Sequence, residues 1–73
     1  MIKILKQFGF REGDLKNEFV RGKYLAKYSP ITDYVYMTIY KSPDRKYFDT
    51  ATFKTAEQLK SCLQGAFGGV LAR

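Results

Sequence analysis

Residues 33–53, with the sequence DYVYMTIYKSPDRKYFDTATF, carry the strongest pattern in this chain and constrain its fold more than any other stretch. From Tyr34 to Lys41 the side chains alternate with a period of two and nearly all favour strands, which predicts a β-strand. Proline and aspartate then occupy the second and third positions of the segment from Ser42 to Arg45, as is typical of a tight turn. The segment from Tyr47 to Phe53 is again rich in aromatic and β-branched residues, so we predict an antiparallel hairpin.

The first strand of this hairpin has two unlike faces, because successive side chains of a strand point to opposite sides of the sheet. One face is aliphatic and the other is rich in tyrosine. The aliphatic face carries Val35, Met37 and Ile39, and the other carries Tyr34, Tyr36, Thr38 and Tyr40. We expect the aliphatic face to contact the core.

The register of the hairpin decides which residues of its second strand share the face of Val35. With a four-residue loop, the residues that join that face are Phe48, Thr50 and Thr52. A loop one residue shorter places Tyr47, Asp49, Ala51 and Phe53 there instead, because a slip by one residue exchanges the two faces. We predict the first register, since it keeps Asp49 away from the core.

The N-terminal part of the chain is patterned less clearly. Apolar residues alternate with more polar ones over residues 1–10, which predicts a strand, and residues 11–14 carry a turn signal. The segment from Leu15 to Tyr28 fits either a helix or two short strands separated at Gly22. We favour strand after Glu18, because glycine in a helix interior costs about 1 kcal/mol and Phe, Val and Tyr favour strands.

The clearest helix signal in the sequence begins at Thr55. Gln58 follows three residues later and completes a capping box, and apolar residues then recur at helical spacing. We therefore predict a helix over residues 56–67 that packs on the sheet through one stripe. The stripe consists of Leu59, Cys62, Leu63, Ala66 and Phe67. Gly68 and Gly69 predict its end, and the apolar tail at residues 70–72 either packs on the core or is free to bind a partner.

Together these elements predict an α+β fold in one small domain spanning residues 1–73. It would consist of a small antiparallel sheet of three to four strands with one C-terminal amphipathic helix packed on one face. Seventy-three residues allow one thin core. A hydrophobic content of 45% is too high for a disordered chain, so we expect it to fold.

The expected location follows from the cysteine count and from the apolar runs. A single cysteine, Cys62, cannot form an internal disulfide, which favours a reducing compartment. The first ten residues have only a broken apolar run, and no small-residue cleavage site of a signal peptide follows them. No apolar run approaches the ~18 residues that a membrane span needs. We therefore predict a cytoplasmic protein without membrane contact.

The residue types argue against catalysis. The chain has no histidine, the commonest general base and metal ligand. Cys62 lies on the predicted core stripe, where a free cysteine behaves as a small hydrophobe. Asp33 and Asp44 lie in or beside turns, where aspartate commonly bonds the local backbone. No zinc-ligand spacing, phosphate loop or dinucleotide fingerprint is present. We predict no catalytic residues, no metal, no cofactor and no small-molecule substrate.

What remains is a candidate binding surface. The chain carries 13 Lys and Arg against 7 Asp and Glu, a net charge of +6, which suggests a polyanionic partner but also serves solubility. Tyrosines on the uncovered face can stack bases, and the cations of the turn can meet phosphates. The candidate binding residues are Tyr34, Tyr36, Tyr40, Lys41, Arg45 and Lys46. In the competing arrangement these rings pack along neighbouring strands or beneath residues 15–28.

Two functions fit this surface. We predict a small basic binding protein, without enzymatic activity, that contacts single-stranded DNA or RNA or a nucleoprotein machine. The alternative is a regulator of the phage or mobile-element type that binds a host protein complex, such as RNA polymerase or a CRISPR surveillance complex. Tyr and Arg are enriched in the hot spots of protein interfaces, so the same residues serve either function.

Overall fold

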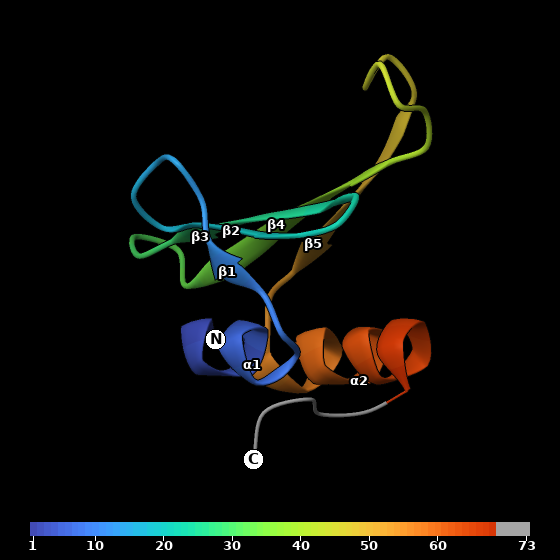
Figure 1. The fold of residues 1–73 in the computed structure, drawn as a ribbon. Helices are drawn as coiled ribbons and strands as arrows, with labels where there is room; N and C mark the ends of the chain where they lie inside the picture. The colour runs from blue at the N-terminus through green and yellow to red at the C-terminus, as the bar shows by residue number, and fades with distance from the viewer. Residues whose placement is uncertain (69–73) are drawn as a thin grey trace.

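A computed structural model describes residues 1–68 and shows two helices packed on one face of a five-stranded antiparallel sheet (Figure 1). In chain order the elements are α1 (Ile2–Gln7), β1 (Arg11–Glu12), β2 (Glu18–Arg21), β3 (Tyr24–Ser29), β4 (Tyr34–Tyr40), β5 (Phe48–Phe53) and α2 (Ala56–Phe67). The strands lie side by side in chain order, each antiparallel to the next. Gly69 and the apolar tail at residues 70–72 lie outside the described residues.

The predicted α+β class and the C-terminal helix are confirmed, but the sheet has five strands where we predicted three or four. The preference for strand after Glu18 is also confirmed. Gly22 begins the connection between β2 and β3 with a φ of 55°, a left-handed conformation that glycine adopts without steric cost. The additional strand is β1, which has only two residues and pairs with β2.

The prediction of an N-terminal strand is wrong, because residues 2–7 form α1. Leu5 and Phe8 lie three residues apart and are both fully buried, so the apolar pattern of this stretch also fits a helix. A helix is about 10 Å wide, whereas five strands spaced by about 4.8 Å span roughly 20 Å. One helix therefore cannot cover this sheet, and α1 packs beside α2 to cover the rest of its inner face.

The predicted register of the β4–β5 hairpin is also wrong. Met37 lies opposite Ala51 and Val35 opposite Phe53, so the face of Val35 includes Ala51 and Phe53. The amide of Lys41 donates to the carbonyl of Tyr47 at 2.7 Å, so the loop comprises residues 42–46, one more than we assumed.

The predicted register keeps Asp49 away from the core. The observed register also leaves this side chain exposed, because the hairpin is long. The far end of the hairpin rises away from the helices (Figure 1). Asp49 therefore points to the inner side without being buried, and its carboxylate lies 2.8 Å from the ammonium of Lys41.

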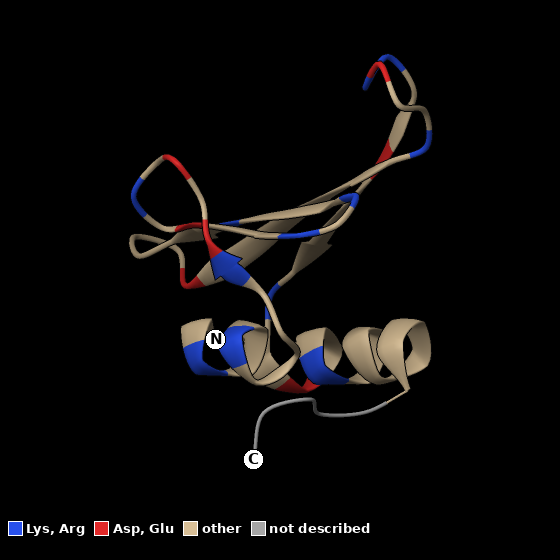
Figure 2. Cartoon of the chain, in the orientation of Figure 1, with Lys and Arg blue, Asp and Glu red and all other residues tan. Residues whose placement is uncertain are grey.

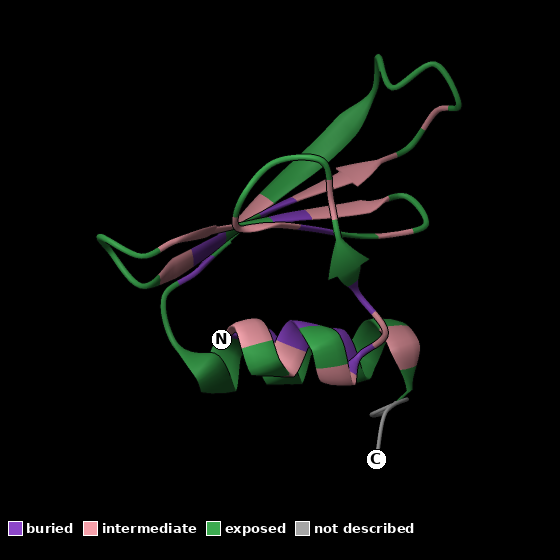
Figure 3. Ribbon diagram, turned by 60° about the vertical axis from the view of Figure 1, so that its left-hand side comes forward, coloured by how far each residue is buried: buried purple, intermediate pink, exposed green. Residues whose placement is uncertain are grey.

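The core lies between the helices and the sheet (Figure 3). Its members come from both helices, from the segment after α1 and from strands β2 to β5. They are Leu5, Phe8, Phe10, Phe19, Ala26, Val35, Met37, Phe53, Leu59 and Leu63. From α2 only Leu59 and Leu63 are buried, and Cys62 is exposed, which corrects the predicted stripe. Helix α2 starts as predicted, with the hydroxyl of Thr55 accepting from the amide of Gln58 at 3.2 Å.

Candidate nucleic-acid interface

The outer face of the sheet is the side that points away from both helices (Figure 1). Its residues follow from the strand registers and from the alternation of side chains along each strand. They are Arg11, Glu18, Val20, Leu25, Lys27, Ser29, Tyr34, Tyr36, Thr38, Tyr40, Phe48, Thr50 and Thr52. Strands β2 and β3 lie beside β4 in the sheet, so they do not cover its tyrosines.

All three candidate tyrosines of β4 lie on the outer face. Tyr36 is 42% exposed, whereas Tyr34 and Tyr40 are half-buried. The rings of Tyr34 and Tyr36 meet edge to face, with centroids 6.4 Å apart. Tyr40 makes a similar contact with Phe48 at 6.1 Å. Because edge contacts hold each ring while leaving part of its face open, this row can accept further aromatic groups.

Cations lie over both ends of the tyrosine row. The guanidinium carbon of Arg45 is 5.0 Å from the centroid of Tyr40, and the ammonium of Lys54 is 5.8 Å from that of Tyr34. Both distances are within the range of cation–π attraction. Lys27 on β3 lies directly opposite Tyr36 and is exposed, so it adds a third positive charge beside the middle ring.

The other two predicted cations are placed differently. Lys41 points to the inner side of the hairpin, where it pairs with Asp49. The hydrogen bond that the Lys41 ammonium donates to that carboxylate raises the pKa of Lys41 above its usual value. Lys46 is exposed in the hairpin loop, and its backbone amide donates to the Asp44 carboxylate at 3.1 Å. The structure therefore brings Arg45 to the tyrosine row and directs Lys41 away from it.

The aspartates near the hairpin have local partners. The hydroxyl of Tyr28 donates to the carboxylate of Asp33 at 2.6 Å, which raises the pKa of this tyrosine. The hydroxyl of Ser42 donates to the carboxylate of Asp44, also at 2.6 Å. Across residues 1–68, no cluster of His, Cys, Asp and Glu side chains could hold a metal ion. The carboxylates of this region thus order turns and pair with neighbouring side chains.

The Ser42 hydroxyl and then the Lys46 amide hold the pKa of Asp44 below its ordinary value of 3.8. A carboxyl with a lowered pKa stabilises the folded loop above pH 3.8, and this contribution disappears as the pH falls through the folded-state pKa. We expect a carbon-detected NMR titration of Asp44 to have its midpoint below 3.8 in the wild type, and Ser42→Ala to raise the midpoint. An unchanged midpoint in Ser42→Ala would show that this hydrogen bond does not set the pKa.

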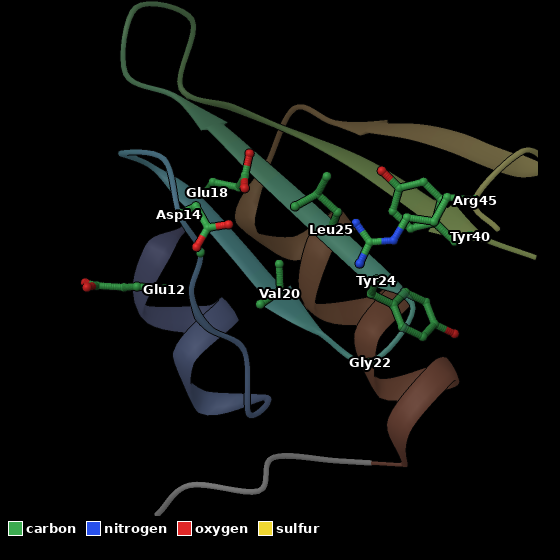
Figure 4. Close-up of a pocket in the computed structure, with 10 residues that line it drawn as sticks. Glu12, Asp14, Glu18, Val20, Gly22, Tyr24, Leu25, Tyr40 and Arg45 are labelled. Atoms are coloured by element: carbon green, nitrogen blue, oxygen red, sulfur yellow. The ribbon is translucent and has the colours of Figure 1, made fainter. Parts of the chain in front are cut away.

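A depression of about 310 Å³ adjoins the tyrosine row over β2 and β3 (Figure 4). Val20 and Leu25 form its apolar floor, and Arg45 with Tyr40 lies at one end. Asp14 and Glu18 lie at the opposite end, whereas the Glu12 side chain points away from the depression and its carboxylate lies 3.5 Å from the ammonium of Lys6. The chain around the connection between β1 and β2 carries both acidic and basic residues, whereas Lys27, Arg45 and Lys54 lie near the tyrosine row (Figure 2).

Sequence reasoning missed three residues of this surface, namely Lys27, Phe48 and Lys54. Phe48 was assigned to the inner face by the wrong register. Lys54 follows β5 and meets Tyr34 only in the observed register, and Lys27 meets Tyr36 through the pairing of β3 with β4. The correct register of the hairpin, together with the strand assignment of residues 24–29, would have placed all three.

Comparisons of this chain with protein-family models, with curated proteins and with solved structures give no match. Neither helix within residues 1–68 is long and apolar enough to cross a membrane.

Proposed function

We propose that this chain binds single-stranded nucleic acid through the outer face of its sheet. The observation that carries the proposal is the tyrosine row of β4, which has Lys54 over one end and Arg45 over the other. From Tyr34 to Tyr40 the row extends over roughly 20 Å, since a strand rises about 3.4 Å per residue. It thus combines stacking surfaces with positive charge, as sequence-tolerant binders of single strands do.

In the proposed complex, bases stack on the tyrosines and phosphates approach the cations. Tyr36 is the most exposed ring of the row, so it is the principal stacking residue. Lys27, Arg45 and Lys54 would each neutralise a phosphate. The three cations near the tyrosine row would hold the nucleic-acid strand over β3 to β5, and the carboxylates of Asp14 and Glu18 would disfavour its passage over β2.

The backbone of Arg45 supports a binding role for this residue. Its φ is 62°, a left-handed conformation that costs a residue with a Cβ about 1 to 2 kcal/mol relative to glycine. Glycine would fit this position of the loop with less strain. Arginine instead places its guanidinium over Tyr40, where it faces the proposed site.

The direct test is a titration of labelled single-stranded DNA and RNA of about 12 nucleotides, a length within the usual site sizes of such proteins. We expect the affinity to fall steeply with salt, by about 0.7 log units per log unit of salt for each phosphate neutralised. Absence of binding at low salt would refute the proposed function.

Replacing Tyr36 with alanine should weaken binding by about 1 to 3 kcal/mol, because one base loses its stacking partner. Tyr47 provides the matched control, since it is 70% exposed but points to the inner side of the hairpin. We expect Tyr47→Ala to bind as the wild type does. Equal losses in the two variants, measured by the same titration, would show that the outer face is not the contact surface.

Arg45→Gly should change stability and affinity in opposite directions. Relief of the left-handed backbone should raise the free energy of unfolding by about 1 kcal/mol. Loss of the cation should weaken binding. It should also lower the magnitude of the salt slope, which is the slope of log affinity against log salt concentration, by about 0.7. Lys60→Ala is the control, because it removes one exposed positive charge from α2, on the other side of the sheet. A salt slope that falls equally in both variants would indicate attraction by net charge alone.

A protein partner is the second candidate, favoured by the far end of the hairpin. There Tyr47 is 70% exposed on the inner side of the hairpin, Phe48 is 52% exposed on the outer face, and Arg45 lies in the adjoining loop, a composition found in interface hot spots. A regulator that binds a host protein complex would use this end. Capture from a nuclease-treated lysate separates the two functions when a Tyr47→Ser/Phe48→Ser variant is used in parallel. A protein retained by the wild type and lost by the variant favours this second function.

A further inference from the structure

Strand β5 forms one edge of the sheet, and the backbone groups along this free edge have no partner strand within residues 1–68. The strand order places β4 on one side of it, and within residues 1–68 no strand lies on the other. β5 has six residues, and its one ionised side chain, Asp49, is already paired with Lys41. It contains neither proline nor a bulge in its pairing with β4. The features that usually prevent an edge strand from pairing with another chain are therefore few here.

Two backbone hydrogen bonds determine which β5 residues present free groups. Lys41 donates to Tyr47, so odd-numbered residues of β5 bond to β4. Tyr40 donates to Lys23, so even-numbered residues of β4 bond to β3. Since hydrogen bonding alternates along an antiparallel pair, the outward amides and carbonyls of β5 are those of Phe48, Thr50 and Thr52. The next amide, that of Lys54, donates to the Gln58 side chain at 3.0 Å.

The opposite edge of the sheet offers no comparable ladder. β1 consists only of Arg11 and Glu12, both charged. The amide of Gly13 bonds back to Glu18 at 2.7 Å, which leaves Glu12 as the only residue of this strand whose backbone faces outward. A short, charged edge of this kind discourages pairing. The exposed ladder is therefore restricted to β5.

We propose that two copies of this chain pair through β5, antiparallel and related by a two-fold axis at Thr50. The three outward residues are symmetric about Thr50, so one register pairs all of them: Thr50 with Thr50 of the second copy, and Phe48 with Thr52 in both directions. Each pair exchanges two N–H···O bonds. The two sheets become one continuous sheet with both outer faces on the same side.

The side chains of this register are compatible with pairing. The two Thr50 residues meet across the axis, a favourable cross-strand pair. Asp49 lies opposite Ala51 of the second copy, so the two carboxylates do not face each other. At each end Lys46 approaches Lys54 of the second copy, which places like charges together. Association should therefore strengthen as salt rises, whereas the proposed nucleic-acid binding weakens.

Sedimentation equilibrium at concentrations up to ~1 mM tests this pairing. We expect the average mass to rise from 8.5 kDa toward twice that value, and to rise further at higher salt. The amide of Thr50 should become protected from hydrogen exchange over the same concentration range. A mass that stays at 8.5 kDa throughout overturns the proposal. The same result is expected if the edge of β5 binds a segment of a different protein instead of a second copy.

Two variants of Thr50 locate the interface. Thr50→Pro removes an amide that the monomer does not use, and proline is tolerated at edge positions whose amide faces solvent. Thr50→Lys places two positive charges at the axis, while Thr38→Lys adds the same charge on the same face, directly across in β4. We expect both Thr50 variants to remain monomeric and Thr38→Lys to dimerise. Dimers in both Thr50 variants would refute the β5 interface, whatever the outcome of the nucleic-acid titrations.

Discussion

Phe8→Ala is expected to remove a large part of the stability of this domain. Phe8 is the largest fully buried side chain, and it packs where α1 joins the core. Truncating a buried phenylalanine costs about 3 to 5 kcal/mol. A domain of 73 residues has a total stability of only about 4 to 11 kcal/mol, at the usual 0.05 to 0.15 kcal/mol per residue. The variant should therefore lose about half of its stability at the middle of these ranges, and nearly all of it at their unfavourable end.

Urea denaturation followed by circular dichroism measures this effect. The matched control is Phe48→Ala, because Phe48 is 52% exposed on the outer face. Its loss should cost much less, since little buried area disappears. Similar denaturation midpoints for the two variants would contradict the position of α1 against the core.

Arg21→Met should be the second most damaging substitution. The Nη1 of Arg21 donates to the carbonyl of Phe8 at 2.6 Å, directly after the last residue of α1. Its guanidinium carbon lies 3.7 Å from the ring centroid of Phe67 in α2. One side chain of β2 thus binds the end of one helix and stacks on the other. A hydrogen bond from a charged group contributes about 1.5 to 3 kcal/mol, and a cation–π contact adds about 0.5 to 2 kcal/mol.

Methionine retains the apolar stem of Arg21 but removes the charge and the donors, so we expect a loss of about 2 to 4 kcal/mol. In a domain of this size, that corresponds to a fall in melting temperature of roughly 10 to 25 °C. Arg45→Met is the control, because Arg45 is exposed and its cation–π contact lies on the outer face. A melting temperature that falls equally in both variants would show that Arg21 does not join the helices to the sheet.

Features that depend on neighbouring residues were predictable from the sequence. The strand of Tyr34 to Tyr40 repeats its pattern over enough residues to exclude a helix, and proline marks the reversal that follows it. Thr55 and Gln58 specify the start of α2 through hydrogen bonds between near neighbours. The face of β4 that meets the core was also predictable, because the alternation of aliphatic and tyrosine residues along it leaves one choice.

Features that depend on the coverage of the sheet were not predictable. The alternation in residues 1–10 fits both a strand and a helix, and the choice follows from the inner face that α2 alone leaves uncovered. Cys62 shares the helical spacing of Leu59 and Leu63. It is nevertheless exposed, because the position of the sheet relative to α2 admits only a narrow stripe of that helix.

Some features of the candidate site were likewise predictable from local sequence, and others depend on the tertiary structure. The sequence by itself determined that Tyr34, Tyr36 and Tyr40 share a face and that Arg45 lies at the adjoining turn, because strand periodicity and turn chemistry are local. Only the tertiary structure decided that no element of residues 1–68 covers this face, that Lys27 and Lys54 lie beside its tyrosines, and that Lys41 points to the opposite side. These outcomes depend on which residues of different strands lie opposite each other, and a change of one residue in a loop reverses them.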